Sequence, residues 1–138
     1  MRKRKKVKVI IDTNLWISFI ISNRFDHLEA LLASGKVRLL FSMDLVAEVQ
    51  ETIRKPKLKK FFTGYAIEEM LITLEPYIDF IDAGRSAKIC RDPEDDFLLD
   101  LARDGHADYL LTGDKDILVL RKFGKTKITT FSEFLKKM

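Results

Sequence analysis

Short apolar runs with strand character alternate with helical stretches along most of the chain. The predicted strands cover residues 7–11, 37–41, about 77–81, 109–111 and a weak run at 127–130. The predicted helices cover residues 15–21, 26–34, 42–55, about 65–74, 92–104 and 117–123, with a last helix after Thr130. This alternation predicts an α/β domain with a small, mostly parallel sheet of about five strands that is covered by helices on both faces.

Residues with capping chemistry mark the predicted helix starts. Ser42 is expected to cap the third helix, because its hydroxyl can accept a free backbone amide of the first turn. Asp92 followed by Pro93 is a favoured start for the helix at 92–104. Thr130 with Glu133 three residues later has the spacing of a capping box.

The size and composition of the chain indicate one globular domain. It has 138 residues, of which 46% are hydrophobic and 33% are charged, enough for one core and too few for two typical domains. We expect a basic tail at residues 1–6 and a single domain at 7–138. The lone cysteine, Cys90, excludes an internal disulfide and fits a reducing compartment, so a cytoplasmic protein without a membrane span is expected. The two histidines stand far apart, which argues against a structural zinc site.

Carboxylates are concentrated in two short segments of a chain whose net charge is +4. These acids are Asp92, Glu94, Asp95, Asp96, Asp114 and Asp116. Carboxylates this close repel one another unless a cation lies between them, and oxygen ligands without Cys or His select Mg²⁺ or Mn²⁺. Asp12 ends the first predicted strand and Asp114 follows the fourth. Because α/β sheets bind ligands beyond the carboxyl ends of their strands, both acids reach one crevice if those strands are neighbours.

Each acid also has an ordinary structural interpretation. Asp12 can cap a helix, Asp114 and Asp116 can stabilise a turn and a helix dipole, and Glu48 can be a solvated helical residue. The joint pattern favours a metal site more than any member does alone.

Helical phase sorts the acids of the helix at 92–104. The predicted buried stripe consists of Phe97, Leu98, Leu101 and Ala102. The opposite, solvated side is expected to hold Asp96, Asp100 and Arg103. The phase therefore excludes Asp96 from an inward-facing site and does not choose between Glu94 and Asp95.

Four segments together resemble the PIN domain family, and most closely its subgroup of toxin components of toxin–antitoxin pairs. They are Ile11–Asn14, Leu45–Val49, residues 90–102 and Thr112–Asp116. The resemblance implies a three-layer α/β/α fold and a metal-dependent endoribonuclease that hydrolyses RNA phosphodiester bonds. It also implies a homodimer and a cognate antitoxin as partner.

The resemblance also assigns roles to individual residues. The implied metal-binding and catalytic acids are Asp12, Glu48, Asp95 and Asp114, with Asp116 as an accessory metal ligand. Glu48 would also help to position the attacking water, and Asn14 and Thr112 would orient the carboxylates. The bound ion would be Mg²⁺ or Mn²⁺.

Basic residues are clustered in three runs. Six lie between Arg2 and Lys8, five between Arg54 and Lys60, and four between Arg121 and Lys127. Such runs are commonly solvated faces, but they also suit a polyanionic substrate. The candidates for contacting the RNA backbone are Lys55, Lys57, Lys59 and Lys60, with Arg121 and Lys122 as weaker candidates.

The main alternative is a non-catalytic, receiver-like signalling module that binds Mg²⁺ at its strand ends and is phosphorylated at Asp79 or Asp82. Such a module needs two adjacent acids after the first strand and a lysine at the end of the fifth. Here Thr13 follows Asp12 and Lys127 begins the fifth predicted strand, so both features are missing. A third possibility is a PIN fold that binds RNA without cutting it.

Overall fold

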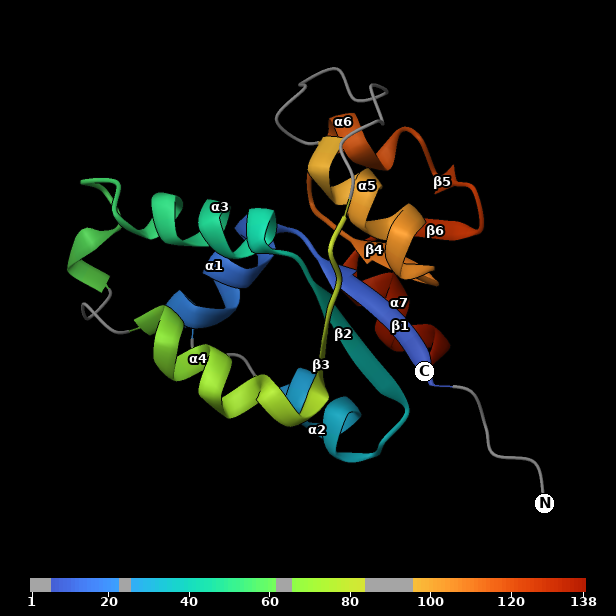
Figure 1. Ribbon diagram of the computed structural model, residues 1–138, viewed down its shortest axis with the longest axis horizontal. Coiled ribbons are helices and arrows are strands. Elements are labelled where there is room, and N and C mark those ends of the chain that lie inside the picture. Colours follow the sequence, from blue (N-terminus) through green and yellow to red (C-terminus); the bar gives the residue numbers. More distant parts are fainter. Residues whose placement is uncertain (1–5, 23–25, 62–65, 84–95) are drawn as a thin grey trace.

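A six-stranded sheet lies at the centre of the computed structural model, which describes residues 6–22, 26–61, 66–83 and 96–138 (Figure 1). The strands are β1 (Val7–Ile11), β2 (Val37–Phe41), β3 (Ile78–Phe80), β4 (Tyr109–Leu111), β5 (Lys122–Phe123) and β6 (Thr126–Thr129). Their order across the sheet is β3-β2-β1-β4-β6-β5. All neighbours are parallel except β5 and β6, which form an antiparallel pair. The expected α/β fold with a mostly parallel sheet is confirmed.

Helices cover both faces of this sheet. They are α1 (Thr13–Ser22), α2 (Asp26–Ala33), α3 (Met43–Ile53), α4 (Ala66–Leu74), α5 (Asp96–Gly105), α6 (Lys115–Leu118) and α7 (Phe131–Lys137), with short 3-10 turns η1 (Lys59–Phe61) and η2 (Glu75–Tyr77). The chain steps from β1 to β2 to β3 in one direction and returns through β4 to β6. Right-handed crossovers therefore place α1–α4 on one face and α5 and α6 on the other. Figure 1 shows α5 in front of the sheet and α7 behind it.

Aromatic side chains fill the layer between α1, α7 and the sheet. Trp16 is fully buried, and its ring centroid lies 5.4 Å from that of Phe41 at the end of β2. Phe19 of α1 meets Phe131 of α7 edge-on at 4.9 Å. These contacts fix α1 and α7 on the same face, because edge-to-face rings pack well at this distance.

The helix starts follow the expected capping chemistry where the structure describes them. The Ser42 hydroxyl accepts the Leu45 amide at 3.2 Å, and the Thr130 hydroxyl accepts the Glu133 amide at 3.2 Å. The Glu133 carboxylate accepts the Thr129 hydroxyl at 2.5 Å. The predicted cap at Asp92 lies outside the described residues, as do residues 1–5 of the predicted tail, so the division at residue 6 stays a prediction.

The predicted helix at 117–123 is wrong in extent. Helix α6 begins at Lys115 and ends at Leu118, and residues Lys122–Phe123 form β5. Arg121 and Gly124 both have positive φ, 58° in each case, which ends the helix and turns the chain back. The turn at Gly124 pairs Phe123 with Thr126, and an antiparallel hairpin replaces the last turns of the expected helix.

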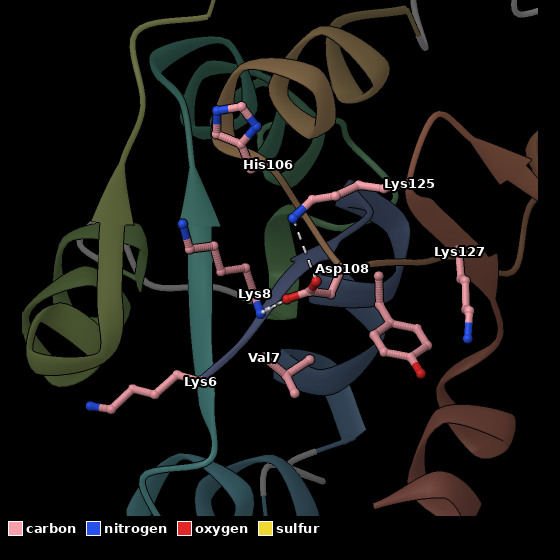
Figure 2. Close-up of a pocket in the computed structure, with 8 residues that line it drawn as sticks. Lys6, Val7, Lys8, His106, Asp108, Lys125 and Lys127 are labelled. Carbon is pink, nitrogen blue, oxygen red and sulfur yellow. Dashed lines mark hydrogen bonds and ion pairs between the residues drawn. The ribbon is translucent and has the colours of Figure 1, made fainter. Parts of the chain in front are cut away.

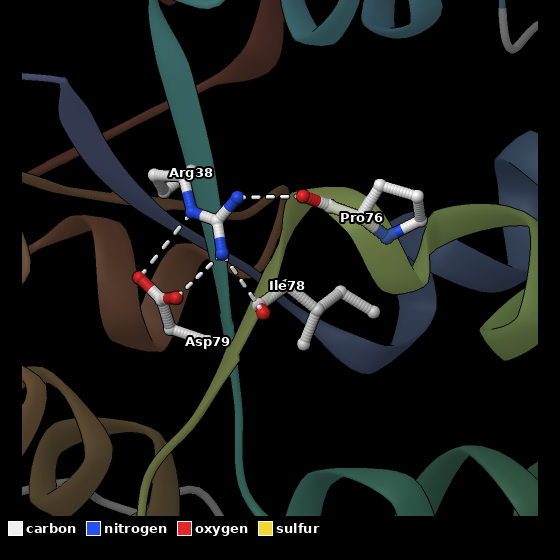
Figure 3. A network of polar contacts seen from close by, with 4 residues as sticks. All are labelled: Arg38, Pro76, Ile78 and Asp79. Carbon is white, nitrogen blue, oxygen red and sulfur yellow. Dashed lines mark hydrogen bonds and ion pairs between the residues drawn. The ribbon is translucent and has the colours of Figure 1, made fainter.

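A cluster of polar contacts fastens the short edge strand β3 to β2. The guanidinium of Arg38 pairs with both oxygens of Asp79, at 2.6 and 3.4 Å (Figure 3). It also donates to the carbonyls of Pro76 at 2.6 Å and Ile78 at 3.1 Å. One side chain on β2 thus holds the end of η2 and the start of β3, which has only three residues of its own.

The two edges of the sheet differ in the side chains that they carry. At the amino-terminal edge a cavity of about 650 Å³ opens beside the starts of β1 and β4 (Figure 2). Of the acids predicted from the sequence, Asp12 and Asp114 follow the carboxyl ends of β1 and β4. No helix among the described residues is long and apolar enough to cross a membrane.

Candidate active site

Strands β1 and β4 end side by side at the point where the strand order reverses. Ile11 pairs with Leu111, and the Asp12 amide continues the ladder by donating to the Leu111 carbonyl at 3.0 Å. Asp12 and Thr112 are therefore the first residues beyond two neighbouring strands. This position is the crevice in which α/β sheets bind ligands. Because β1 and β4 are neighbours, Asp12 and Asp114 can reach the same crevice.

Thr112 connects the two acids. Its hydroxyl is buried and donates to the Asp12 carboxylate at 2.6 Å. The same hydroxyl accepts the Asp114 amide at 3.0 Å. Because a hydroxyl can donate once and accept twice, one side chain fixes both the orientation of Asp12 and the path of the chain into Asp114. The contacts agree with the orienting role expected for Thr112.

Asp114 also caps the short helix α6. Its carboxylate accepts the Asp116 amide at 2.9 Å, so the ordinary structural interpretation of Asp114 holds as well. Both acids are half-buried. The bond keeps one oxygen of Asp114 turned toward the start of α6, where Asp116 is the second residue.

The Asp12 carboxyl is perturbed by its buried position. It is only 6% exposed, and burial raises its pKa above the ordinary value of 3.8. The Thr112 hydroxyl and the backbone amides of Asn14 and Thr13 lower the pKa, and the negative charge of Asp114 raises it. Burial dominates because a carboxylate in a poorly solvated site loses most of its hydration. A cation beside Asp12 would relieve both the desolvation and the repulsion from Asp114.

The remaining predicted acids are less closely tied to this pair. Glu48 lies on α3, is half-buried and takes part in a polar interaction. Asp95 lies outside the described residues, and of Asp96 the structure gives only its place at the start of α5. Within the described part of the chain, no three acids, histidines or cysteines stand close enough together to hold a metal ion. The four-acid site therefore stays a prediction, of which the structure describes the half built on Asp12 and Asp114.

Asn14 is exposed on the first turn of α1. Its backbone amide, which any residue could supply, hydrogen-bonds to the Asp12 carboxylate and lowers the pKa of that group. The orienting role expected of the Asn14 side chain remains a prediction.

The expectation that Asp100 is solvated is wrong. Asp100 is only 4% exposed, and its carboxylate pairs with the Arg103 guanidinium at 3.1 Å. Leu99 is also fully buried, so α5 is covered on more of its circumference than a single stripe. The acid and arginine three residues apart were the available signal, since this spacing places both on one helix face.

The four candidate RNA-binding lysines, Lys55, Lys57, Lys59 and Lys60, are all exposed and follow the end of α3. The 11 residues of α3 span about 16 Å at 1.5 Å per residue. These lysines thus lie a full helix length from the strand end at which α3 begins. Their role stays a prediction, as does that of Arg121 and Lys122, which are also exposed.

Comparison of the sequence with known proteins assigns the chain to a family. The sequence profile of the PIN domain matches residues 8–116, which include Asp12, Glu48 and Asp114. The chain belongs to the PIN domain family. A relative, the uncharacterized protein MJ1680 of Methanocaldococcus jannaschii, is 28% identical over 142 residues that cover 95% of this chain and 91% of the relative. PIN domains have a nuclease-type fold, generally act as hydrolases and typically use divalent metal ions.

Membership in the PIN family favours a nuclease over the receiver-like module. The structure agrees at Asp79, which a receiver would need as a free phosphate acceptor. Asp79 lies within β3 and both of its oxygens are paired with Arg38. The assignment to the toxin subgroup is a finer statement and stays a prediction.

Proposed function

We propose that this PIN domain is a metal-dependent endoribonuclease. The observation that carries the proposal is the buried Asp12 carboxylate, held by Thr112 beside Asp114 at the reversal point of the sheet. Burial opposes ionisation of Asp12, and a folded protein keeps such a group where a cation compensates for the lost hydration.

The proposed ligands of Mg²⁺ or Mn²⁺ are the carboxylates of Asp12, Glu48, Asp95 and Asp114, with Asp116 accessory. Oxygen donors alone suit these hard cations. The bound ion would supply a hydroxide nucleophile and neutralise charge on the phosphate.

The side chains around the ion would orient the ligands and position the attacking water. Thr112 fixes the rotamer of Asp12 by its hydrogen bond and limits the carboxylate to one orientation. Glu48 is proposed to accept a hydrogen bond from the attacking water and so to position it. Asp114 would face the same crevice from β4, with its other oxygen held by the start of α6.

An RNA digestion tests this assignment. The wild type should cut single-stranded RNA with Mn²⁺ and lose activity in chelator, and Asp12→Asn should lose cleavage with Mn²⁺ while keeping its fold. Asp26→Asn, which removes an exposed carboxylate at the start of α2, is the control and should keep full activity. Full activity of Asp12→Asn would refute the proposal.

A second pair of variants tests the assignment of the third acid. Asp95→Asn should abolish cleavage, and Asp96→Asn should not. Loss of activity in Asp96→Asn alone would show that the helical phase was misjudged.

We further propose that the enzyme is the toxin of a toxin–antitoxin pair, that it forms a homodimer and that a cognate antitoxin protein silences it. Induced expression in a bacterial host should arrest growth with the wild type and not with Asp12→Asn. Sedimentation of the purified chain should give the mass of a dimer. Normal growth with active enzyme would remove the toxin role and leave the nuclease proposal intact.

A further inference from the structure

The cavity at the amino-terminal edge of the sheet carries most of its charge as lysine. It has a volume of about 650 Å³ and is lined by Lys6, Val7, Lys8, His106, Asp108, Tyr109, Lys125 and Lys127 (Figure 2). We call it the lysine cavity. Four of these residues are lysines and one is an aspartate, so the lining has a net positive charge and the cavity suits an anionic ligand.

The lysine cavity is separate from the candidate active site. Val7 and Tyr109 are the first residues of β1 and β4, whereas Asp12 and Thr112 follow the last. The five residues of β1 span about 17 Å at 3.3 Å per residue. An extended polyanion held at one edge can therefore reach the other only by running along the molecule.

The one carboxylate among the described residues that line the cavity is already engaged. Asp108 accepts the Lys8 backbone amide at 2.9 Å and pairs with the Lys125 ammonium at 3.7 Å (Figure 2). The ammonium groups of Lys6, Lys8 and Lys127 have no carboxylate partner within the described part of the chain. Their charge is therefore available to a ligand.

The chemistry of the lining favours phosphate groups over bases. The ring of Tyr109 is covered by the ammonium groups of Lys127 at 6.0 Å and Lys137 at 5.8 Å. Phe134 packs edge-on against the same ring at 5.0 Å. A ring occupied in this way offers little surface on which a base could stack. Among the described residues, no arginine lines the cavity, and lysine binds phosphate as a point charge without the planar fork that reads base edges.

We propose that the lysine cavity binds the phosphate backbone of the RNA that the acid site cleaves. This inference rests on the proposed ribonuclease function and adds a second, sequence-independent anchor on the far edge of the sheet. RNA long enough to cover both edges gains contacts that a short RNA lacks. An acidic protein segment is the competing ligand for such a surface, and the test separates the two.

Binding is measured by fluorescence anisotropy with a single-stranded RNA of about 20 nucleotides in chelator, so that cleavage does not interfere. The test variant is Lys6→Gln/Lys127→Gln, which removes two lining lysines without a carboxylate partner among the described residues. The matched control is Lys36→Gln/Lys136→Gln, which removes two exposed lysines that do not line the cavity. Thermal unfolding verifies that both double variants are folded.

The test variant should bind more weakly and with a lower salt dependence. Each lost phosphate contact lowers the slope of log K against log salt by about 0.7, so two contacts lower it by about 1.4 and weaken binding roughly 25-fold at 0.1 M salt. The control should match the wild type. In cleavage with Mn²⁺, the test variant should show a raised KM on long RNA, an unchanged kcat, and unchanged kinetics on RNA of about 4 nucleotides, which is too short to reach from one edge to the other.

Equal salt slopes for the test and control variants would overturn the inference, and the ribonuclease proposal would stand if the wild type still cuts RNA. Polyglutamate is titrated in the same way as the acidic competitor. Loss of polyglutamate binding in the test variant with unchanged RNA binding would also overturn the inference and would identify the cavity as a site for an acidic protein. A lowered salt slope without any cleavage by the wild type would support the cavity and refute the nuclease.

Discussion

Replacing Thr112 with valine tests how the candidate active site is held together. Valine has nearly the shape of threonine but lacks the hydroxyl. The change removes the 2.6 Å bond to the Asp12 carboxylate and the 3.0 Å bond from the Asp114 amide. Thr112 is only 1% exposed, so water cannot readily replace the hydroxyl beside Asp12.

The size of the effect follows from the charge of the acceptor. A hydrogen bond to an ionised group contributes about 1.5–3 kcal/mol to stability, and a neutral one about 0.5–1.5 kcal/mol. We therefore expect Thr112→Val to lower the free energy of unfolding by about 2 kcal/mol at pH 8. At about 2.1 cal/mol/K per residue, the 138 residues give an unfolding entropy near 0.3 kcal/mol/K, so Tm should fall by about 7 °C.

The effect should also depend on pH. Folding raises the pKa of Asp12, so the folded, metal-free protein holds the proton more tightly than the unfolded chain and loses stability as the pH rises from 3.8 through the folded pKa. The Thr112 bond opposes this rise, and its removal raises the folded pKa further. The difference between Thr112→Val and the wild type should be smallest below pH 3.8 and should grow as the pH rises.

Urea unfolding in chelator at pH 4 and pH 8 measures this difference. The matched control is Thr126→Val, which removes a buried hydroxyl that donates to the neutral Ala107 carbonyl at 2.8 Å. The control should lose about 1 kcal/mol at both pH values. Equal and pH-independent losses in the two variants would refute the interpretation of Thr112 as the support of an ionised Asp12.

Two further changes test the scaffold by urea unfolding. Gly105→Ala should lower the free energy of unfolding by about 1–3 kcal/mol, because the added Cβ would lie 2.7 Å from Leu40 Cδ1. Gly113→Ala is the control and should have little effect, because nothing lies within 4 Å of its added Cβ. Equal losses of stability in the two variants would show that the contact at Gly105 relaxes freely. Arg38→Met should destabilise more than Asp79→Asn, since the half-exposed ion pair is worth only about 1 kcal/mol and Arg38 also holds two carbonyls. A larger loss in Asp79→Asn would contradict this order.

The sheet was predictable because its signals are local. The bounds of β1, β2 and β4 agree with the apolar runs at 7–11, 37–41 and 109–111. These runs are short and rich in β-branched residues and leucine, so they do not show the periodicity of a helix. The weak run at 127–130 corresponds to β6 to within one residue. Strand β5 was missed because its hairpin depends on positive φ at Arg121. Arginine gives no sequence signal for that conformation.

The candidate site was predictable to the extent that topology determines it. Asp12 and Asp114 follow strands that proved to be neighbours, and Thr112, for which the resemblance to the PIN family implied an orienting role, hydrogen-bonds to both residues. The burial of Asp100 was missed because periodicity describes one stripe, while α5 is covered by several elements at once. The lysine cavity was not foreseen either, since its lysines come from two distant segments, residues 6–8 and 125–127, that only the fold brings together.

Calorimetric titration of the metal-free protein with Mn²⁺ tests the central claim that the Asp12 pocket holds a divalent cation. The wild type and Asp26→Asn should bind Mn²⁺ with equal affinity and release protons on binding, because Asp12 must be ionised to act as a ligand. Asp12→Asn should bind at least about 10- to 100-fold more weakly. Unchanged Mn²⁺ affinity in Asp12→Asn would contradict the account.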